Sequence, residues 1–221
     1  MKILQETKEW IAVIKPPELI SEQVGDGSGL GDLLAARNGG YIGVLHRMDR
    51  GVGGVTVYAK TKESASRLSE AVREHRMEKR YLAIAEGIPE APTGEMQDLL
   101  FYDRSRNKVY PVNRKRNGVK EALLQYRVIK TVEHPIEKAP ISLIEVIPFT
   151  GRTHQIRVQF ASRGLPLLGD RKYGGHGTLG IALACSRITV PAHKDQSAAT
   201  VTYTPEGEPW DWFTDAYTTI L

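Results

Sequence analysis

The sequence predicts an α+β fold, with strands and helices mixed in a single domain over residues 1–221. Runs rich in Val, Ile and Thr at 10–14 and 55–58 are typical of strands. A helix is predicted from Thr61, a good capping residue, to about His75, because apolar residues recur there at helical spacing. Strand, helix and strand follow one another without a low-complexity linker, which favours one domain.

The first strand is stopped by Pro16 and Pro17, which cannot continue the interior of a ladder. Residues 25–31 form a glycine-rich loop, but they lack the Gly-Lys-Ser/Thr ending of a phosphate-binding loop. A short helix is expected at 32–37. Further strands are predicted by the β-rich runs at 79–87, 121–132, 141–149 and 181–190, with an edge strand at 200–205. Trp210, Trp212 and Phe213 are expected to anchor a terminal helix.

A second helix is predicted over 154–163, with Thr153 as its N-cap, Gly164 just past its end and Pro166 preventing continuation. The segment before it, 101–120, looks like a hairpin that turns at Asn117-Gly118.

The composition is that of an ordinary soluble protein, with 41% hydrophobic and 25% charged residues in 24.6 kDa. The only cysteine, Cys185, lies in an apolar run and excludes an internal disulfide, which fits a reducing compartment. The chain shows neither an apolar signal core nor a stretch of membrane-spanning length. We therefore expect a cytoplasmic protein, without membrane contact and monomeric.

Positive charge is concentrated in one stretch although the net charge is only +4. Residues 104–120, called the basic segment below, hold seven Lys or Arg, among them Arg114, Lys115 and Arg116, and no carboxylate. Such a local field suits a polyanion such as RNA, and it also fits a solvated face.

The residues 46–61 carry the clearest chemistry. Asp49 lies between Arg47 and Arg50, and nearby positive charge favours the ionised form of a carboxylate. Asp49 is therefore a poor proton donor and a candidate nucleophile, and it equally fits an ion-paired turn residue. The six histidines are scattered without a metal-binding pattern, and no nucleophile-elbow motif is present, so neither a metal site nor a serine hydrolase is expected.

Each remaining candidate also has an ordinary structural interpretation. Arg152 and Arg157 fit helix-surface charge, His154 fits a capping residue, and Tyr81 fits half-buried packing on a strand.

In combination these residues resemble the RluA family of RNA pseudouridine synthases. The resemblance spans about residues 10–193 and rests on motifs in the same order and at compatible spacing: Val13-Ile-Lys-Pro16, His46-Arg-Met-Asp-Arg50, Lys79-x-Tyr81, Gly151-Arg-Thr-His-Gln-Ile-Arg157, Gly169-Asp170 and Tyr173-Gly174. It implies a pseudouridine synthase fold, a mixed and mostly antiparallel sheet flanked by helices. It also implies RNA as partner, with rRNA and tRNA both open, and no cofactor or metal.

By that resemblance Asp49 is the catalytic aspartate, Arg157 its basic partner, and Tyr81 the residue that stacks on the target base. Arg47 corresponds to the arginine that takes the place of the extruded uridine. We expect Arg152, His154, Arg114, Lys115 and Arg116 to contact RNA. The family's optional N-terminal S4-type domain is expected to be absent.

The sequence departs from the family where Val52 and Gly53 stand in place of the usual Thr-Ser. Asp49 can attack C1′ of the ribose or remove the 2′ proton, and the sequence leaves both routes open. The main prediction is an RNA uridine isomerase acting on a flipped nucleotide. A catalytically silent RNA-binding module and a hydrolytic nucleosidase are the competing hypotheses.

Overall fold

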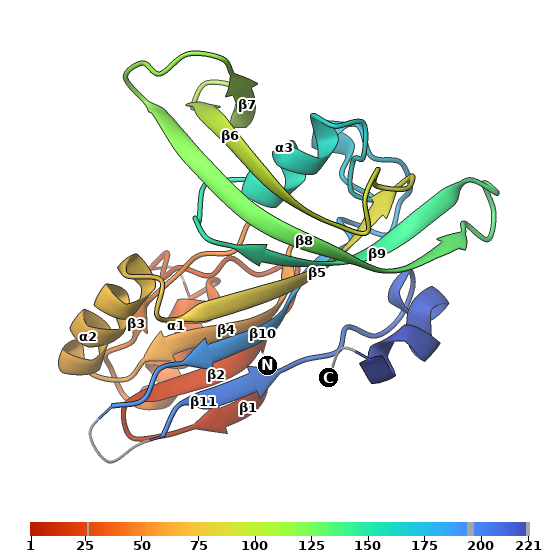
Figure 1. The fold of residues 1–221 in the computed structure, drawn as a ribbon. Helices are drawn as coiled ribbons and strands as arrows, with labels where there is room; N and C mark the ends of the chain where they lie inside the picture. The colour runs from red at the N-terminus through yellow and green to blue at the C-terminus, as the bar shows by residue number, and fades with distance from the viewer. Residues whose placement is uncertain (26, 194–196, 220–221) are drawn as a thin grey trace. The chain divides into compact units, whose positions relative to one another are not determined.

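A computed structural model describes residues 1–25, 27–193 and 197–219 of the chain (Figure 1). The chain forms two compact units, each assembled from two stretches of sequence. Unit 1 comprises Met1–Lys79 and Ala184–Pro205, and unit 2 comprises Arg80–Leu183 and Glu206–Leu221. Each unit combines helices with its own group of strands, which confirms the predicted α+β class.

The strands of unit 1 pair in the order β1, β2, β4, β10, with β3 beside β4 and β11 beside β10. Their bounds are β1 Lys2–Glu6, β2 Trp10–Lys15, β3 Gly43–Val44, β4 Gly53–Ala59, β10 Leu183–Val190 and β11 Ala199–Thr202. All of these pairs are antiparallel except β4 with β10, which run parallel. The short, largely polar β1 and the two-residue β3 were not predicted, because neither shows an alternating apolar pattern.

Helix α1 (Leu30–Asn38) buries Leu30 and Leu34 against Ile11, Val13 and Tyr58 in the core of unit 1. The loop before it holds the predicted glycine-rich stretch, whose Asp26 lies outside the described residues.

Helix α2 (Lys62–Arg73) begins as predicted, with the Thr61 hydroxyl accepting from the Ser64 backbone N–H at 3.1 Å. It ends before His75, which adopts a left-handed conformation (φ 58°).

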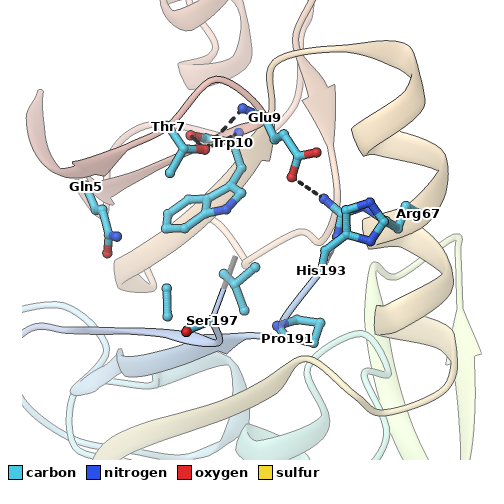
Figure 2. A pocket seen from close by; sticks show the side chains of 10 residues that line it. Gln5, Thr7, Glu9, Trp10, Arg67, Pro191, His193 and Ser197 are labelled. Atoms are coloured by element: carbon cyan, nitrogen blue, oxygen red, sulfur yellow. Dashed lines mark hydrogen bonds and ion pairs between the residues drawn. The ribbon is translucent and has the colours of Figure 1, made fainter. Parts of the chain in front are cut away.

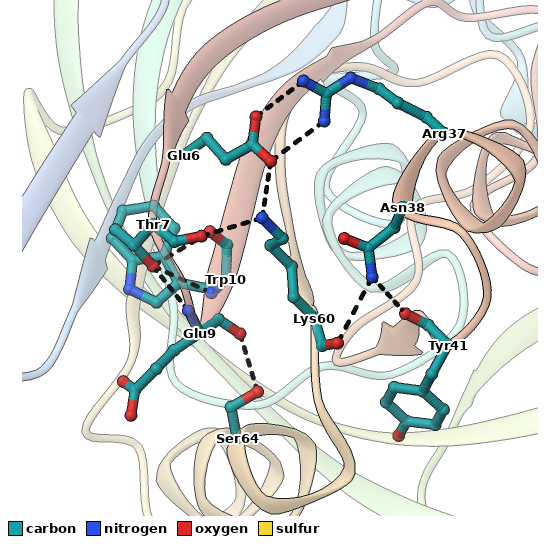
Figure 3. A network of polar contacts seen from close by, with 9 residues as sticks. All are labelled: Glu6, Thr7, Glu9, Trp10, Arg37, Asn38, Tyr41, Lys60 and Ser64. Atoms are coloured by element: carbon teal, nitrogen blue, oxygen red, sulfur yellow. Dashed lines mark hydrogen bonds and ion pairs between the residues drawn. The ribbon is translucent and has the colours of Figure 1, made fainter.

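A polar network joins β1, α1 and the end of β4 (Figure 3). The Arg37 guanidinium donates to both oxygens of Glu6, at 3.0 and 2.8 Å, and Lys60 Nζ lies 2.7 Å from the same carboxylate. These two cations, Arg37 above all, hold the pKa of Glu6 down to about 2. Lys60 Nζ also donates to the backbone oxygen of Thr7, so the network fastens the edge strand to the rest of the unit.

Unit 2 contains an antiparallel sheet in the order β5, β9, β8, β6, β7. Its strands are β5 Glu78–Glu86, β6 Thr93–Asp103, β7 Lys108–Val112, β8 Val119–Glu133 and β9 Pro140–Pro148. The prediction of a hairpin turn at Asn117-Gly118 is wrong, because β7 and β8 pair with opposite edges of β6 rather than with each other. The hairpin turn of this region is 104–107, between β6 and β7.

Helix α3 (Gln155–Ala161) is shorter than predicted, and its N-cap is His154 rather than Thr153. His154 has φ 52°, a left-handed conformation that is uncommon outside glycine, and its side chain makes no capping bond. A 3₁₀ turn, η1 (Arg171–Tyr173), follows.

The predicted terminal helix is present as η2 (Trp210–Thr219), which is 3₁₀ in character. It buries Trp210, Phe213 and Tyr217. Among the described residues, no helix has the length and apolarity needed to cross a membrane.

Candidate active site

Asp49 lies in the loop between β3 and β4 of unit 1, and backbone bonds fix this loop. Gly51 N–H donates to the Pro17 oxygen at 2.9 Å, and Met48 N–H donates to Ser21 Oγ at 3.1 Å. Val52 N–H closes a turn by donating to the backbone oxygen of Asp49, at 3.0 Å. The Asp49 carboxylate is thus presented, partly buried, by a loop tied to the segment that follows β2.

Lys15 supports the same loop from beneath. Its side chain is fully buried, and Nζ donates to the backbone oxygens of Val52 at 2.8 Å and Pro16 at 3.0 Å. Burial lowers the pKa of Lys15 to about 8, although the nearby carboxylates of Glu18, Asp49 and Glu22 oppose that shift. A cation therefore lies under the loop at neutral pH, bound to carbonyl groups.

The glycine at position 54 is required by the pairing of β4 with β10. Gly54 has φ 110°, and a Cβ there would lie 2.3 Å from the backbone oxygen of Cys185. Gly53 is less constrained, since an added Cβ would meet the Lys15 oxygen at 3.3 Å. Val52, the other departure from the family pattern, is buried.

Arg47 lies in the same loop, two residues before Asp49, and its side chain is largely exposed. Its guanidinium pairs with Glu22 at 2.9 Å, and 69% of the side chain is exposed. An exposed guanidinium held by one surface carboxylate can exchange that partner for an RNA group at small cost.

His46, which directly precedes Arg47, is buried and neutral. Burial, assisted by the charge of Lys79, lowers the pKa of His46 to about 3. Its Nε2 accepts weakly from Val57 N–H at 3.5 Å, and within the described part of the chain Nδ1 has no hydrogen-bond partner.

In unit 2, Arg157 of α3 forms a buried two-point ion pair with Asp170. Arg157 Nε and Nη2 lie 2.6 and 2.8 Å from the two carboxylate oxygens, and the side chains are only 5% and 1% exposed. Such a pair fixes the guanidinium plane as well as its position. Asp170, part of the Gly169-Asp170 motif, therefore orients Arg157 within this unit.

Tyr173 lies beside this pair, one 3₁₀ turn after Asp170, and residues three apart on such a turn face the same side. The centre of its ring is 5.2 Å from the Arg157 guanidinium. Its hydroxyl is 2.8 Å from His154 Nδ1 and accepts from Val109 N–H at 2.8 Å. His154, predicted to bind RNA, is thus buried against Tyr173.

Tyr81 lies on β5 opposite Val146 of β9, and only 9% of it is exposed. Next to it, the buried carboxylate of Glu145 is shared by Arg80 at 3.4 Å and Arg127 at 3.2 Å. Two guanidinium groups, of Arg80 and Arg127, therefore lie close to the predicted stacking residue.

The basic segment is exposed at Arg114, Lys115 and Arg116. Lys115 pairs with Glu121 at 2.5 Å, and the Arg116 guanidinium lies over the Phe101 ring at 4.8 Å. Arg152 Nε donates to the backbone oxygen of Glu121 at 2.8 Å, so Arg152 lies beside the C-terminal end of the same segment. Arg152 and the three exposed cations thus belong to one region of unit 2.

A pocket of about 230 Å³ lies in unit 1 between the β1–β2 and β10–β11 strands (Figure 2). Trp10 and His193 line it together with the ion pair of Arg67 and Glu9, at 2.6 Å. None of the predicted catalytic residues lines this pocket. Within the described ranges, no group of three or more His, Cys, Asp or Glu residues is arranged to hold a metal ion.

A comparison with known structures confirms the fold. The human RNA pseudouridylate synthase domain containing 1 superposes with a TM-score of 0.77 at 21% identity, covering 93% of this chain and 83% of that one. The predicted pseudouridine synthase fold is therefore correct.

Sequence comparison identifies the family. A family model described as RNA pseudouridylate synthase matches residues 9–162. An uncharacterized RNA pseudouridine synthase of Zymomonas mobilis is 32% identical over 197 residues, which cover 87% of this chain and 85% of the relative. The ribosomal large subunit pseudouridine synthase C of Rickettsia bellii is 33% identical over 132 residues, covering 59% of this chain and 42% of the relative.

The chain belongs to the RNA pseudouridylate synthase family, and the resemblance to its RluA branch is confirmed. It spans 34% to 42% of the length of four curated relatives that it matches.

Proposed function

We propose that this protein converts uridine to pseudouridine in a structured RNA. The observation that carries the proposal is the family match over residues 9–162, which includes the Asp49 loop and the whole of α3. Isomerisation requires the base to leave ribose C1′ through N1, turn and rejoin through C5, and a stacked base has no room to do so. The target nucleotide must therefore be flipped out of its helix.

In this proposal Asp49 acts on the ribose, either as a nucleophile at C1′ or as the base that removes the 2′ proton. Its place in a loop fixed by backbone bonds supports the role, because a reacting group gains from a rigid position. Arg157 is the proposed basic partner. Its ion pair with Asp170 supports that role by holding the guanidinium in one orientation.

Two further residues are proposed to handle the flipped nucleotide. Arg47 would fill the gap left in the RNA, which its exposed guanidinium supports. Tyr81 would stack on the uracil. Because Tyr81 is only 9% exposed, it has a small accessible surface, and binding the base requires local movement around it.

RNA would be held by the basic segment through Arg114, Lys115 and Arg116 and, beside it, by Arg152. His154, also expected to contact RNA, is buried against Tyr173 and would respond to RNA through that residue. Positive charge without a nearby excess of carboxylates supports RNA binding by the segment. Ribosomal RNA and transfer RNA are both candidate substrates, and the name of the Rickettsia relative favours ribosomal RNA. We also propose a monomer that acts in the cytoplasm, without a cofactor.

Tritium release from RNA labelled at uridine C5 tests the isomerase. We expect release with the wild type and none with Asp49→Asn, which keeps the size of the side chain and removes its charge. Asp211→Asn is a matched control, because an amide can still accept from Gly207 N–H as the Asp211 carboxylate does. Continued release by Asp49→Asn would overturn the proposal. Free uracil among the products would instead indicate a nucleosidase, and RNA binding without release would indicate a silent module.

A further inference from the structure

Strand β7 of the basic segment is an outer strand of the unit 2 sheet, and one of its edge groups is bonded to a residue beside Arg157. Val109 N–H points to the Tyr173 hydroxyl at 2.8 Å, and Val109 is buried. A buried N–H on an outer strand needs such an acceptor. The Tyr173 hydroxyl therefore supplies the acceptor that this N–H of the basic segment requires.

The same hydroxyl continues to α3. An aromatic hydroxyl has one proton and two lone pairs. Val109 N–H donates to one lone pair of the Tyr173 hydroxyl. The hydroxyl proton can then be donated to His154 Nδ1, which lies 2.8 Å away. His154 begins α3 in a left-handed conformation, which a non-glycine residue keeps only where its surroundings enforce it. Tyr173 is one of those surroundings.

The ring of Tyr173 provides a second connection. The Arg157 guanidinium lies 5.2 Å from the ring centre and Lys108 Nζ of β7 lies 5.4 Å from it, so a cation of the basic segment and Arg157 share one aromatic ring. Lys172, next to Tyr173, donates from Nζ to the backbone oxygen of Asn107 at 2.9 Å. Residues 107–109 are thus fastened to the turn that carries both Asp170 and Tyr173.

We propose that Tyr173 is a positioning residue that couples the basic segment to Arg157, so that RNA bound on the segment tightens the placement of an arginine that Asp170 already orients. The inference rests on the proposed function, since it assumes that the basic segment binds RNA and that Arg157 serves the reaction. Tyr173 itself contacts neither the base nor the ribose in this proposal. It acts through Val109, His154 and Arg157.

Tyr173→Phe tests the coupling, because it keeps the ring and removes only the hydroxyl. The matched control is Tyr217→Phe, which removes another buried hydroxyl of unit 2, bonded to the Trp210 oxygen at 3.2 Å. We expect Tyr173→Phe to lower kcat about tenfold at saturating RNA with KM changed less than twofold, and Tyr217→Phe to leave both constants unchanged. Equal effects of the two variants on kcat would overturn the proposal.

A double-mutant cycle separates coupling from local damage. Changing Arg114, Lys115 and Arg116 together to Gln should raise KM and also lower kcat, because bound RNA then engages the segment poorly. Adding Tyr173→Phe to this triple variant should lower kcat little further. Independent, multiplying effects on kcat would show that Tyr173 does not act through the segment.

One readout does not depend on catalysis. The imidazole NMR signals of His154 should shift when a short RNA hairpin binds the wild type, and should shift much less in Tyr173→Phe. An RNA-dependent shift in a protein that releases no tritium would refute the isomerase and leave the coupling intact. Tritium release without any shift of His154 would refute the coupling alone.

Discussion

The loop that carries Asp49 and the turn that orients Arg157 are held in place by different kinds of group. Around Asp49, the supporting groups are backbone carbonyls, a buried lysine and a glycine that lets two strands approach. Around Arg157, they are side chains, with a carboxylate in two-point contact and an aromatic ring. The comparison teaches that one site depends on chain geometry and the other on charge, so different changes should damage each.

The largest effect is expected from Asp170→Ala, which breaks the charge-based site. It leaves the Arg157 guanidinium buried without its partner, and removal of one member of a buried pair costs roughly 3–5 kcal/mol of unfolding free energy. Urea denaturation measures this loss. Arg163→Gln is the control, because the Arg163–Asp98 pair at 2.9 Å is more exposed, and its loss should cost less than about 1 kcal/mol. Equal losses for the two variants would contradict the distinction.

The second prediction concerns the geometry-based site. Lys15 has a pKa of about 8 in the folded protein and 10.5 as its ordinary value. Between these values the unfolded chain binds the proton and the folded chain does not, so stability should rise from pH 8 to pH 10.5, by on the order of 3 kcal/mol. Below pH 8 both states are protonated and this contribution is constant. Denaturation curves of the wild type and Lys15→Met across this range should differ in slope, and parallel curves would contradict the assignment.

His46 gives a third effect at the opposite end of the pH scale, smaller than that of Lys15 over the range from pH 5 to pH 6.5. Its pKa is lowered from 6.5 to about 3 by burial, so below pH 6.5 the unfolded chain takes up a proton that the folded chain refuses. Stability should therefore fall by about 1.4 kcal/mol for each pH unit between pH 6.5 and pH 3, where both states become protonated. Melting temperatures at pH 5 to 6.5 measure this, and His46→Gln should show a flatter dependence.

The smallest effect is expected at the exposed network of Glu6, Arg37 and Lys60. The pKa of Glu6 is lowered from 4.5 to about 2, so its pairing is fully present above pH 4.5 and is lost as the pH falls towards 2. Glu6→Gln should lower the melting temperature slightly at pH 7, and much less than Asp170→Ala does. A larger fall than that of Asp170→Ala would show that the edge of unit 1, and not the Arg157 turn, limits stability.

The sequence was most informative where side-chain chemistry repeats a recognisable spacing. The helix behind Thr61 and the strands at 10–14 and 55–58 were predicted correctly, because capping and alternation are local properties. The hairpin at Asn117-Gly118 was predicted wrongly, because the turn residues indicate a reversal but not which strand pairs with which.

Within the candidate site, sequence reasoning did not assign roles to Lys15, Asp170 and Tyr173. Asp170 and Tyr173 were in view as a motif, and their three-residue spacing on a 3₁₀ turn is the signal that could have placed them together. The burial of Lys15 had no local signal, because its partners are carbonyl oxygens, which every residue possesses. The left-handed backbone conformation of His154 likewise had no signal in the sequence, because the residue types favoured Thr153 as the N-cap.

The division of unit 1 into two separate stretches has a consequence for synthesis of the protein. The part of β10 that pairs with Gly53 and Gly54, Ala184 and Cys185, is made only after all 104 residues from Arg80 to Leu183. At 5–20 residues per second a ribosome needs roughly 5 to 20 s for that stretch. During this interval β4 has no β10 beside it, so a nascent chain already carries Asp49 before the strand that helps to shape its loop exists.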